Sequence, residues 1–527
     1  MEKKTNALTP TLTTEEYEAQ VARLEQQVAE LSAKLKWYEE QFRLAQKKRF
    51  GASSEKTDPN QLELDLFNEA EVLATPKGEE PPMEKITYER RKPAGPRTAK
   101  LDHLPVETVT YELNEDERVC SCCGNPLHEM SSETRHEIAI IPAQVKVVQH
   151  VRKVYACRRC EREEIRTPIV TAPMPNPIYP GSLASPSSMA YVMTQKYVDS
   201  QPLYRQEQQF SRLGLSISRQ TLANWMMYGA EWLSLLTDRM REHLLKQDIL
   251  HADETTLQVL REPGKSAETQ SYLWLYRTGR MGPPIVLYDY KPTRNGEHPR
   301  NFLSGFRGYL HVDGYSGYHK VQGVTLVGCW AHARRKFDEA LKAMPAGQPK
   351  TETAARQGLE FCNQLFAIER GLRDASPEER YAVRMERSKP ILEAYLAWLQ
   401  KQRPRTLPKS LLGQAIAYSL NQWDKLTAFL QDGRLEIDNN RSERSIKPFV
   451  IGRKNWLFAN TPRGAKASAT IYSMIETAKE NGLNPFQYLK YLFEQLPQLA
   501  DPKDTEALDN LLPWSPTLPL VCRTTQS

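Results

Sequence analysis

The chain has 527 residues, of which 26% are charged, and a formal net charge of +6. This length predicts two to four domains and a large buried core. No run of about eighteen apolar residues is present, which excludes a transmembrane helix, and the N-terminus lacks the apolar segment of a secretory signal. We therefore expect a bacterial cytoplasmic protein that does not bind membranes.

The N-terminal region, residues 1–57, contains an apolar heptad pattern followed by a basic patch. Val21, Val28, Leu35 and Phe42 share one heptad position, and Tyr17, Leu24, Leu31 and Tyr38 share the other. Nearly four unbroken heptads predict a coiled coil that joins two or more copies of the chain. The alternative is one amphipathic helix packed on its own domain. Residues 58–103 are polar and rich in proline, which predicts a flexible linker.

Two pairs of cysteines mark residues 104–175 as a small β-rich zinc-binding module. Cys120 and Cys123 form the first Cys-x-x-Cys pair, and Cys157 and Cys160 form the second. In a cytosolic protein this double pair indicates structural Zn²⁺ rather than disulfides. A redox role is a remote alternative. Alternating apolar residues predict strands over 137–141 and 145–148.

Residues 176–247 are predicted to be helical and to contain a helix-turn-helix. The two helices are expected over Leu203–Leu213 and Ser218–Met227, with Ser218 as the N-cap of the second. That helix would present Arg219, Gln220 and Asn224 outward to DNA. A plain helical spacer is the alternative.

Strand and helix signals then alternate as in a ribonuclease-H-like α/β core. We expect strands over Ile249–Leu260, Ser271–Arg277, Pro284–Tyr290, Gly308–Val312 and Thr325–Cys329. Helices are expected near Pro299–Ser304 and from Ala331. Residues 248–345 would form the first part of the core and 434–500 the second, with an all-helical insertion at 346–433 between them. The tail is 501–527, and we expect Leu511–Ser527 to be disordered. The fold class is thus multidomain α+β.

Three carboxylates occur in settings that suit a phosphoryl-transfer site. Asp253 and Asp313 lie on or just past predicted strands, and Glu443 opens a predicted helix from Asn440. Carboxylate oxygens suit Mg²⁺, and two Mg²⁺ ions about 3.5–4 Å apart can clamp the attacking and leaving oxygens of a phosphodiester. We therefore expect these three residues to be catalytic and to bind Mg²⁺. Glu254, Asp338, Glu436 and Asp438 are local competitors, and Glu254 should face away from Asp253 if the segment is a strand.

Basic residues flank the predicted carboxylate site. Seven of them and only one acid occur between Arg441 and Lys466, a pattern typical of a polyanion-binding surface. The DNA contacts expected around the carboxylate site come from two segments. They are His332, Arg334 and Arg335 in the first, and Arg444, Lys447, Arg453 and Lys454 in the second. Cys329 and His332 could instead form half of a metal site, although burial of Cys329 in the last strand is the favoured interpretation.

Several longer motifs together resemble the insertion sequence 66 family of transposases. They include Arg49–Lys56, the segment Cys120–Cys160, His251–Thr255, Asp313–Tyr315, Cys329–Phe337, Asp438–Arg444, Ile451–Phe458, Glu476–Lys479 and Asn481–Pro485. The resemblance implies a DDE transposase whose acidic triad is Asp253, Asp313 and Glu443. The family often has Arg where this chain has Lys447, which weakens bidentate phosphate contact without removing the charge.

The resemblance also implies a reaction and its partners. The triad with Mg²⁺ would cut double-stranded DNA at the ends of an insertion sequence and join the freed 3′ end to target DNA. Other proteins of the same element would assist, and the protein would associate with the bacterial nucleoid. Two rivals remain: an inactive zinc-dependent DNA-binding regulator, and a nuclease or resolvase without strand transfer.

Overall fold

The computed structural model describes residues 14–50, 108, 144–156, 169–344 and 353–524. They fall into two compact units. The larger contains the central sheet and most helices, and the smaller contains the described parts of 73–173 together with 211–215. None of the described helices is long and apolar enough to cross a membrane.

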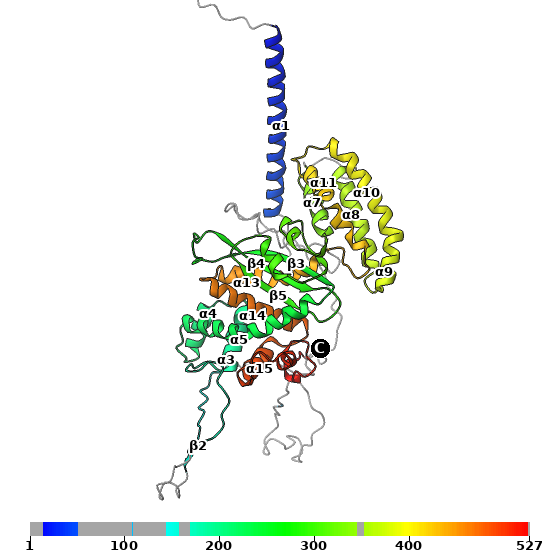
Figure 1. Ribbon diagram of the computed structural model, residues 1–527. Helices are drawn as coiled ribbons and strands as arrows, with labels where there is room; N and C mark the ends of the chain where they lie inside the picture. Colours follow the sequence, from blue (N-terminus) through cyan, green and yellow to red (C-terminus); the bar gives the residue numbers. More distant parts are fainter. Residues whose placement is uncertain (1–13, 51–107, 109–143, 157–168, 345–352, 525–527) are drawn as a thin grey trace, which may run out of the picture. The chain divides into compact units, whose positions relative to one another are not determined.

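A five-stranded mixed sheet forms the centre of the larger unit (Figure 1). Its strands, in spatial order, are β5 (Val286–Lys291), β4 (Gln270–Thr278), β3 (Ile249–Gln258), β6 (Gly308–His311) and β7 (Val324–Val327). The first three strands pair antiparallel, whereas β3, β6 and β7 pair in parallel. All five lie within a few residues of the predicted strands, because they contain apolar, aromatic or β-branched residues and are bounded by turn residues.

Helices from before and after the insertion in the sequence pack around this sheet. Those outside the insertion are α3 (Pro186–Tyr197), α4 (Leu203–Arg212), α5 (Arg219–Leu245), α6 (Glu297–Phe302), α7 (Trp330–Lys342), α13 (Asn440–Trp456), α14 (Pro462–Glu480), α15 (Pro485–Gln495) and α16 (Thr505–Leu511). Helix α14 packs on β5 and on α5, while α13 packs on β3 and β4. The long α13 therefore lies against the strand that bears Asp253.

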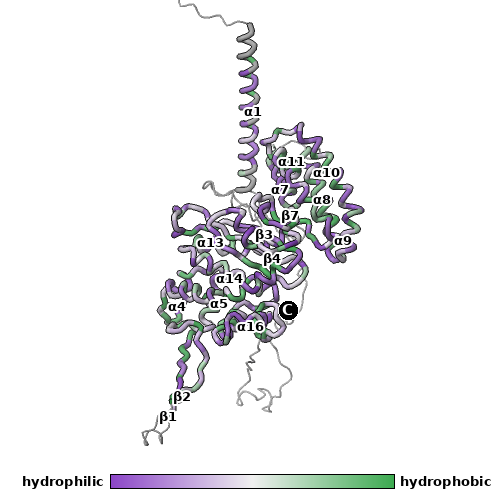
Figure 2. Tube along the Cα trace, viewed as in Figure 1, coloured by the Kyte–Doolittle hydropathy of each residue, from purple (hydrophilic) through white to green (hydrophobic). Residues whose placement is uncertain are grey.

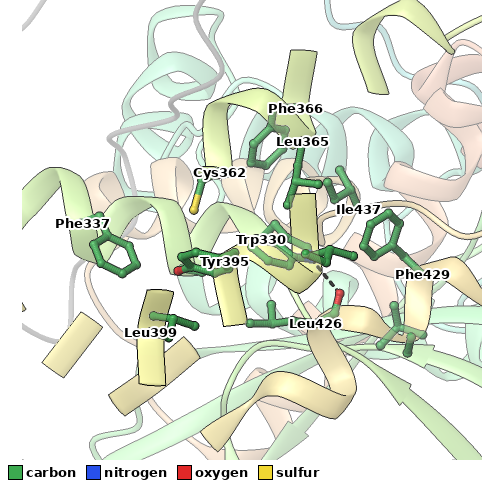
Figure 3. Packing of buried hydrophobic residues seen from close by; sticks show 14 of the residues in the cluster. Trp330, Phe337, Cys362, Leu365, Phe366, Tyr395, Leu399, Leu426, Phe429 and Ile437 are labelled. Carbon is green, nitrogen blue, oxygen red and sulfur yellow. Dashed lines mark hydrogen bonds between the residues drawn. The ribbon is translucent and has the colours of Figure 1, made fainter. Parts of the chain in front are cut away.

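The predicted helical insertion is helical in the described residues 353–433. Its helices are α8 (Ala354–Gly371), α9 (Pro377–Val383), α10 (Lys389–Gln402), α11 (Leu411–Asn421) and α12 (Trp423–Thr427), with a π-helical turn at Arg384–Ser388. They bury an aromatic cluster against α7, centred on Trp330, Phe337 and Tyr395 (Figure 3). Trp330 also donates its indole N–H to the carbonyl oxygen of Leu426 at 2.7 Å. The insertion thereby fixes α7, whose first turn borders the candidate site.

Helix α1 (Thr14–Phe50) exposes those predicted heptad residues whose side chains the structure describes. Leu24, Leu31 and Leu35 are each more than half exposed, and so are the other described members of the pattern. Figure 2 shows hydrophilic and hydrophobic residues interspersed along this helix. The chain therefore has a helical N-terminal region whose apolar stripe is open to a partner.

The helix-turn-helix region differs from prediction in the length of its second helix. Ser218 is the N-cap of α5, as expected, and its side chain accepts from the N–H of Thr221. However, α5 continues to Leu245 instead of ending at Met227, because a stripe including Leu233, Leu236 and Met240 remains buried along its whole length. The second helix thus also forms part of the core.

The prediction of a strand over residues 145–148 was wrong. Residues 145–148 do not form a strand, and Val145, Val147 and Val148 are exposed, so their alternation does not bury a face. The described strands of the smaller unit are instead β1 (Val154–Ala156) and β2 (Ile169–Thr171), which pair antiparallel. The predicted strand at 137–141 and all four zinc-module cysteines lie outside the described residues.

The tail is ordered as far as Thr524, contrary to prediction. Helix α16 is followed by a 3-10 turn at Leu520–Cys522, and Leu512, Leu518 and Cys522 are buried. The N–H of Asn484 donates to the carbonyl oxygen of Cys522 at 2.8 Å. The prediction of disorder relied on the prolines in this segment. It overlooked the widely spaced apolar residues, which are buried individually.

Candidate functional site

The parallel pairing of β3 and β6 places Asp253 and Asp313 side by side. His251 pairs with His311 in the register, and each aspartate lies two residues further along its chain. The two imidazole rings stack with centroids 4.2 Å apart. Because side chains alternate along a strand, residues two apart share a face, so Asp253 continues the face that the histidines begin. Both aspartates are half-buried.

Glu443 is brought to this face by the first turn of α13. Asn439, the N-cap residue, donates its side-chain N–H to the carbonyl oxygen of Ala252 at 2.9 Å. Its side-chain oxygen lies 2.9 Å from Nδ1 of His251. These bonds tie the start of α13 to the β3 backbone immediately before Asp253. The side chain of Glu443 is only 6% exposed, and its Oε1 has no hydrogen-bond partner among the residues that the structure describes.

The three carboxylates are close enough to perturb one another electrostatically. Desolvation, followed by the charges of Asp313, Glu254 and Glu443, raises the pKa of Asp253 well above its usual range. Like charges and burial both disfavour the ionised form. A bound cation would offset this repulsion and would also satisfy the unpartnered oxygen of Glu443. The oxygen-only donor set fits Mg²⁺.

Glu254, which the sequence named only as a competitor of the triad, is a buried carboxylate with its own ion pair and hydrogen bond. Its side chain is 2% exposed and pairs with Arg294 at 2.5 Å, and it accepts a hydrogen bond from the Tyr318 hydroxyl at 2.5 Å. Desolvation and the charge of Asp313 raise its pKa to about 7. Its partners differ from those of Asp253, whose Oδ1 accepts from the N–H of Glu254 at 2.8 Å. The paired acids in His-Ala-Asp-Glu were the available signal.

A glycine-dependent loop holds Asp313. The N–H of Tyr315 donates to Oδ1 of Asp313 at 2.8 Å, and the Arg294 guanidinium lies 4.1 Å from the centroid of the Tyr315 ring. A Cβ atom on Gly317 would lie 2.1 Å from that ring. The spacing Asp-Gly-Tyr-Ser-Gly-Tyr therefore reflects close packing around the carboxylate.

His332 and Arg335 approach Glu443 from α7. Nδ1 of His332 lies 3.9 Å from Oε1 of Glu443, and the guanidinium of Arg335 lies 3.8 Å from Oε2. Burial lowers the pKa of His332, which favours its neutral form. Both residues were predicted to contact DNA, and the structure places them beside the buried carboxylate.

Cys329, His332 and Glu443 form a second group that could hold a metal ion. Their ligand atoms lie within 4.8 Å of one another. Cys329 is fully buried, as predicted, although it is the N-cap residue of α7 and lies past the end of β7 at Val327. Its Sγ accepts from the N–H of Asn439 at 3.2 Å. Burial and the charge of Glu443 raise the pKa of this thiol well above its usual range. The thiol form therefore dominates at neutral pH, whereas a metal-bound cysteine must be a thiolate.

The remaining predicted DNA contacts differ in the exposure and in the intramolecular hydrogen bonds of their side chains. Arg219, Gln220 and Asn224 are exposed at the start of α5, and Arg444 and Lys454 are exposed on α13. Lys447 is half-buried. Two arginines have intramolecular partners: Arg453 donates to Oγ1 of Thr256 at 3.0 Å, and Arg334 donates to Oδ1 of Asn363 at 2.8 Å.

Comparisons with known proteins identify the family to which the chain is similar. A family described as "Transposase IS66 family" matches residues 181–467. A "zinc-finger binding domain of transposase IS66" matches 117–161, an "IS66 C-terminal element" matches 473–514, and "Transposase C of IS166 homeodomain" matches 37–109. The zinc-finger match spans all four predicted cysteine ligands and supports bound Zn²⁺.

Relatives of similar length occur in Sinorhizobium fredii (strain NBRC 101917 / NGR234). The uncharacterized protein y4jD is 32% identical over 473 residues, which cover 87% of this chain and 89% of the relative. The uncharacterized protein y4hP is 31% identical over 448 residues, covering 81% and 78% respectively. By these matches, the chain belongs to the IS66 transposase family.

Proposed function

We propose that this protein is a DDE transposase that cuts DNA at insertion-sequence ends and joins the cut end to target DNA in a Mg²⁺-dependent reaction. The observation that carries the proposal is the convergence of Asp253, Asp313 and Glu443 from two adjacent strands and one helix. Family membership supports a transposase, and the carboxylates supply the chemistry that such an enzyme needs.

The proposed core is ribonuclease-H-like. Three antiparallel strands followed by two parallel ones, with the order β5-β4-β3-β6-β7, support this assignment. In this arrangement Asp253 lies on the central strand and Asp313 follows its parallel neighbour.

Asp253, Asp313 and Glu443 would hold two Mg²⁺ ions, which when bound supply Lewis-acid activation of the attacking and leaving oxygens. The remaining groups orient these ligands. Asn439 anchors the helix that carries Glu443, and the N–H of Tyr315 orients Asp313. Exposed Arg444 and Lys454 would neutralise strand phosphates, so binding should weaken steeply with salt.

The other regions are proposed to recognise and pair the DNA ends. The exposed heptad stripe on α1 suits a coiled coil between two copies. The exposed residues at the start of α5 and the zinc module, with Cys120, Cys123, Cys157 and Cys160 as ligands, are the proposed end-binding surfaces. Accessory proteins of the same element and a nucleoid location belong to the same proposal.

A strand-transfer assay tests the proposal. The full-length protein would be incubated with a duplex from the element's end, a target plasmid and Mg²⁺, and the products resolved as nicked, cut or joined. We expect joined product from the unaltered protein, none from Asp253→Asn, and a normal amount from Asp338→Asn. Asp338 is a suitable control because its carboxylate pairs with Lys342 on α7 at 2.8 Å.

Two other outcomes would favour the rival functions. Cutting without joining, lost in Asp253→Asn, would indicate a nuclease or resolvase. Specific binding of the duplex without any cutting, including with the element's other proteins present, would indicate a regulator.

A further inference from the structure

The outer face of α13 carries a stripe of basic and apolar side chains, and the proposed function leaves its apolar members unused. At helical spacing the stripe consists of half-buried Lys447 and of the exposed residues Arg444, Ile451, Lys454, Leu457 and Phe458. The opposite face is buried and includes Glu443, Ile446 and Val450. The stripe therefore begins beside the carboxylate site and ends just past the C-terminus of the helix.

The apolar end of the stripe is held in a strained conformation. Leu457 has φ +63° and ψ −53°, a region that branched side chains rarely adopt and that corresponds to a strained γ-turn. The turn is closed by the N–H of Phe458, which donates to the carbonyl oxygen of Trp456 at 2.8 Å. Even so, Leu457 is 62% exposed and Phe458 is 41% exposed. This strain does not serve to bury either side chain.

Backbone pairing with the end of β3 fixes this strained turn. The N–H of Ala459 donates to the carbonyl oxygen of Gln258, and the N–H of Leu260 donates to the carbonyl oxygen of Ala459, both at 3.0 Å. Arg453, one turn earlier, binds Thr256 on the same strand. The strand that bears Asp253 thus also anchors the loop that presents Leu457 and Phe458, so the two are rigidly linked.

We propose that Leu457 and Phe458 form an apolar wedge that stacks against an unpaired or unstacked DNA base, while Arg444, Lys447 and Lys454 contact the phosphates leading to it. This inference rests on the proposed function, because it assumes that the carboxylate site acts on DNA. Exposed apolar side chains between basic ones match a nucleic acid, whose bases are apolar on their faces and whose backbone is anionic. A protein partner would not require a row of cations.

The geometry also sets where the base would lie. Fourteen residues separate Glu443 from Leu457, which at 1.5 Å per helical residue is about 21 Å. At 3.4 Å per nucleotide along one strand, that is about six base pairs from the carboxylates. The wedge would therefore contact DNA away from the bond being cut and hold the duplex in position.

Binding measurements without catalysis test the wedge. Two fluorescein-labelled duplexes that share one strand would be compared by anisotropy in EDTA. The second strand is fully complementary in one duplex and makes three central mismatches in the other. We expect the unaltered protein to prefer the mismatched duplex. Leu457→Ala and Phe458→Ala should each weaken binding to it about tenfold and to the paired duplex much less, whereas Phe458→Trp should retain the preference. Lys454→Gln should weaken both probes equally and reduce the salt dependence by about one phosphate contact.

Matched controls and a stacking readout distinguish a wedge from general damage. Leu520→Ala and Tyr381→Ala remove exposed side chains elsewhere, 85% and 44% exposed, and should leave binding unchanged. With 2-aminopurine among the mismatches, its fluorescence should fall on binding to the unaltered protein and not to Phe458→Ala.

Retention of both the preference and the quenching in Phe458→Ala and Leu457→Ala would overturn the wedge while leaving the transposase proposal intact. Failure of the unaltered protein to bind any duplex would instead overturn the proposed function and this inference together.

Discussion

Replacing Glu254 by Gln should stabilise the metal-free protein at alkaline pH. Glu254 is buried beside Asp253 and Asp313, and its pKa rises from 4.5 to about 7. One pKa unit corresponds to about 1.4 kcal/mol, so ionising Glu254 costs the folded chain about 3 kcal/mol relative to the unfolded chain. Gln retains an oxygen that can accept from Arg294, as Oε1 of Glu254 does, and its amide N–H can donate to the Tyr318 hydroxyl, which now donates to Oε2. It carries no charge.

The sign of the pH dependence follows from the raised pKa. Below pH 4.5 the carboxyl is protonated in both states and contributes no difference. As the pH rises from 4.5 to 7, the unfolded chain releases the proton that the folded chain still holds, so the free energy of unfolding falls until the folded carboxyl also ionises near pH 7. The Gln variant avoids this loss. Its free energy of unfolding should therefore be about 3 kcal/mol higher than that of the unaltered protein at pH 8 and equal to it at pH 4.

Urea unfolding in EDTA at pH 4, 6 and 8, followed by tryptophan fluorescence, measures this difference. Glu297→Gln is the control, because its carboxylate is 40% exposed and its ion pair with Lys320 lies at the surface, where such pairs contribute little to stability. Added Mg²⁺ should shrink the gap between Glu254→Gln and the unaltered protein at pH 8, since a cation on Asp313 reduces the repulsion. A Gln variant that is less stable at pH 8, or a gap that is independent of pH, would refute the electrostatic reasoning.

Four further predictions concern the rest of the chain. Arg277→Met should destabilise the fold by about 3–5 kcal/mol and reduce DNA cutting, because the buried Arg277 binds Glu480 at 2.9 Å and also Ser445 on α13; exposed Arg300→Met is the control in the same urea titration. Asp509→Asn should cost at most about 1 kcal/mol at neutral pH, because its carboxylate is 37% exposed. Arg239 lowers the pKa of Asp509 to about 2, so that difference should be full above pH 4 and vanish as the pH falls through 2; a difference that persists at pH 1.5 would contradict it. Leu31→Asp should reduce the molar mass measured by light scattering, whereas Glu30→Asp should not, and an unchanged mass would argue against a coiled coil. Cys157→Ser should lower the zinc content measured by metal analysis, while Cys362→Ser should leave it unchanged.

The sequence alone was enough to predict the five strands and the helical insertion and to propose the candidate triad. The strands contain apolar and β-branched residues bounded by turn signals, and the helices of the insertion have regular apolar spacing, so local patterns sufficed. Asp253, Asp313 and Glu443 could be selected because each follows or opens such an element. The family resemblance then rested on motifs that span nearly the whole chain.

Local patterns failed where burial depends on distant partners. In the tail, Leu512, Leu518 and Cys522 are buried, and the segment packs through α16 on α5 and through the 3-10 turn Leu520–Cys522 on α15. The alternation at 145–148 suggested a strand, but without a face to bury, those valines remain exposed. Neither outcome could be read from residue spacing.

Only the tertiary structure decided which polar residues meet at the carboxylates. The sequence predicted His332 and Arg335 as DNA contacts, whereas the structure places them 3.9 and 3.8 Å from the carboxylate oxygens of Glu443. Glu254 was already a candidate competitor of the triad, but residue spacing could not show that it pairs with Arg294 and accepts a hydrogen bond from Tyr318. Periodicity specifies which face a residue occupies, whereas the partner on that face is set by how separate elements pack in three dimensions.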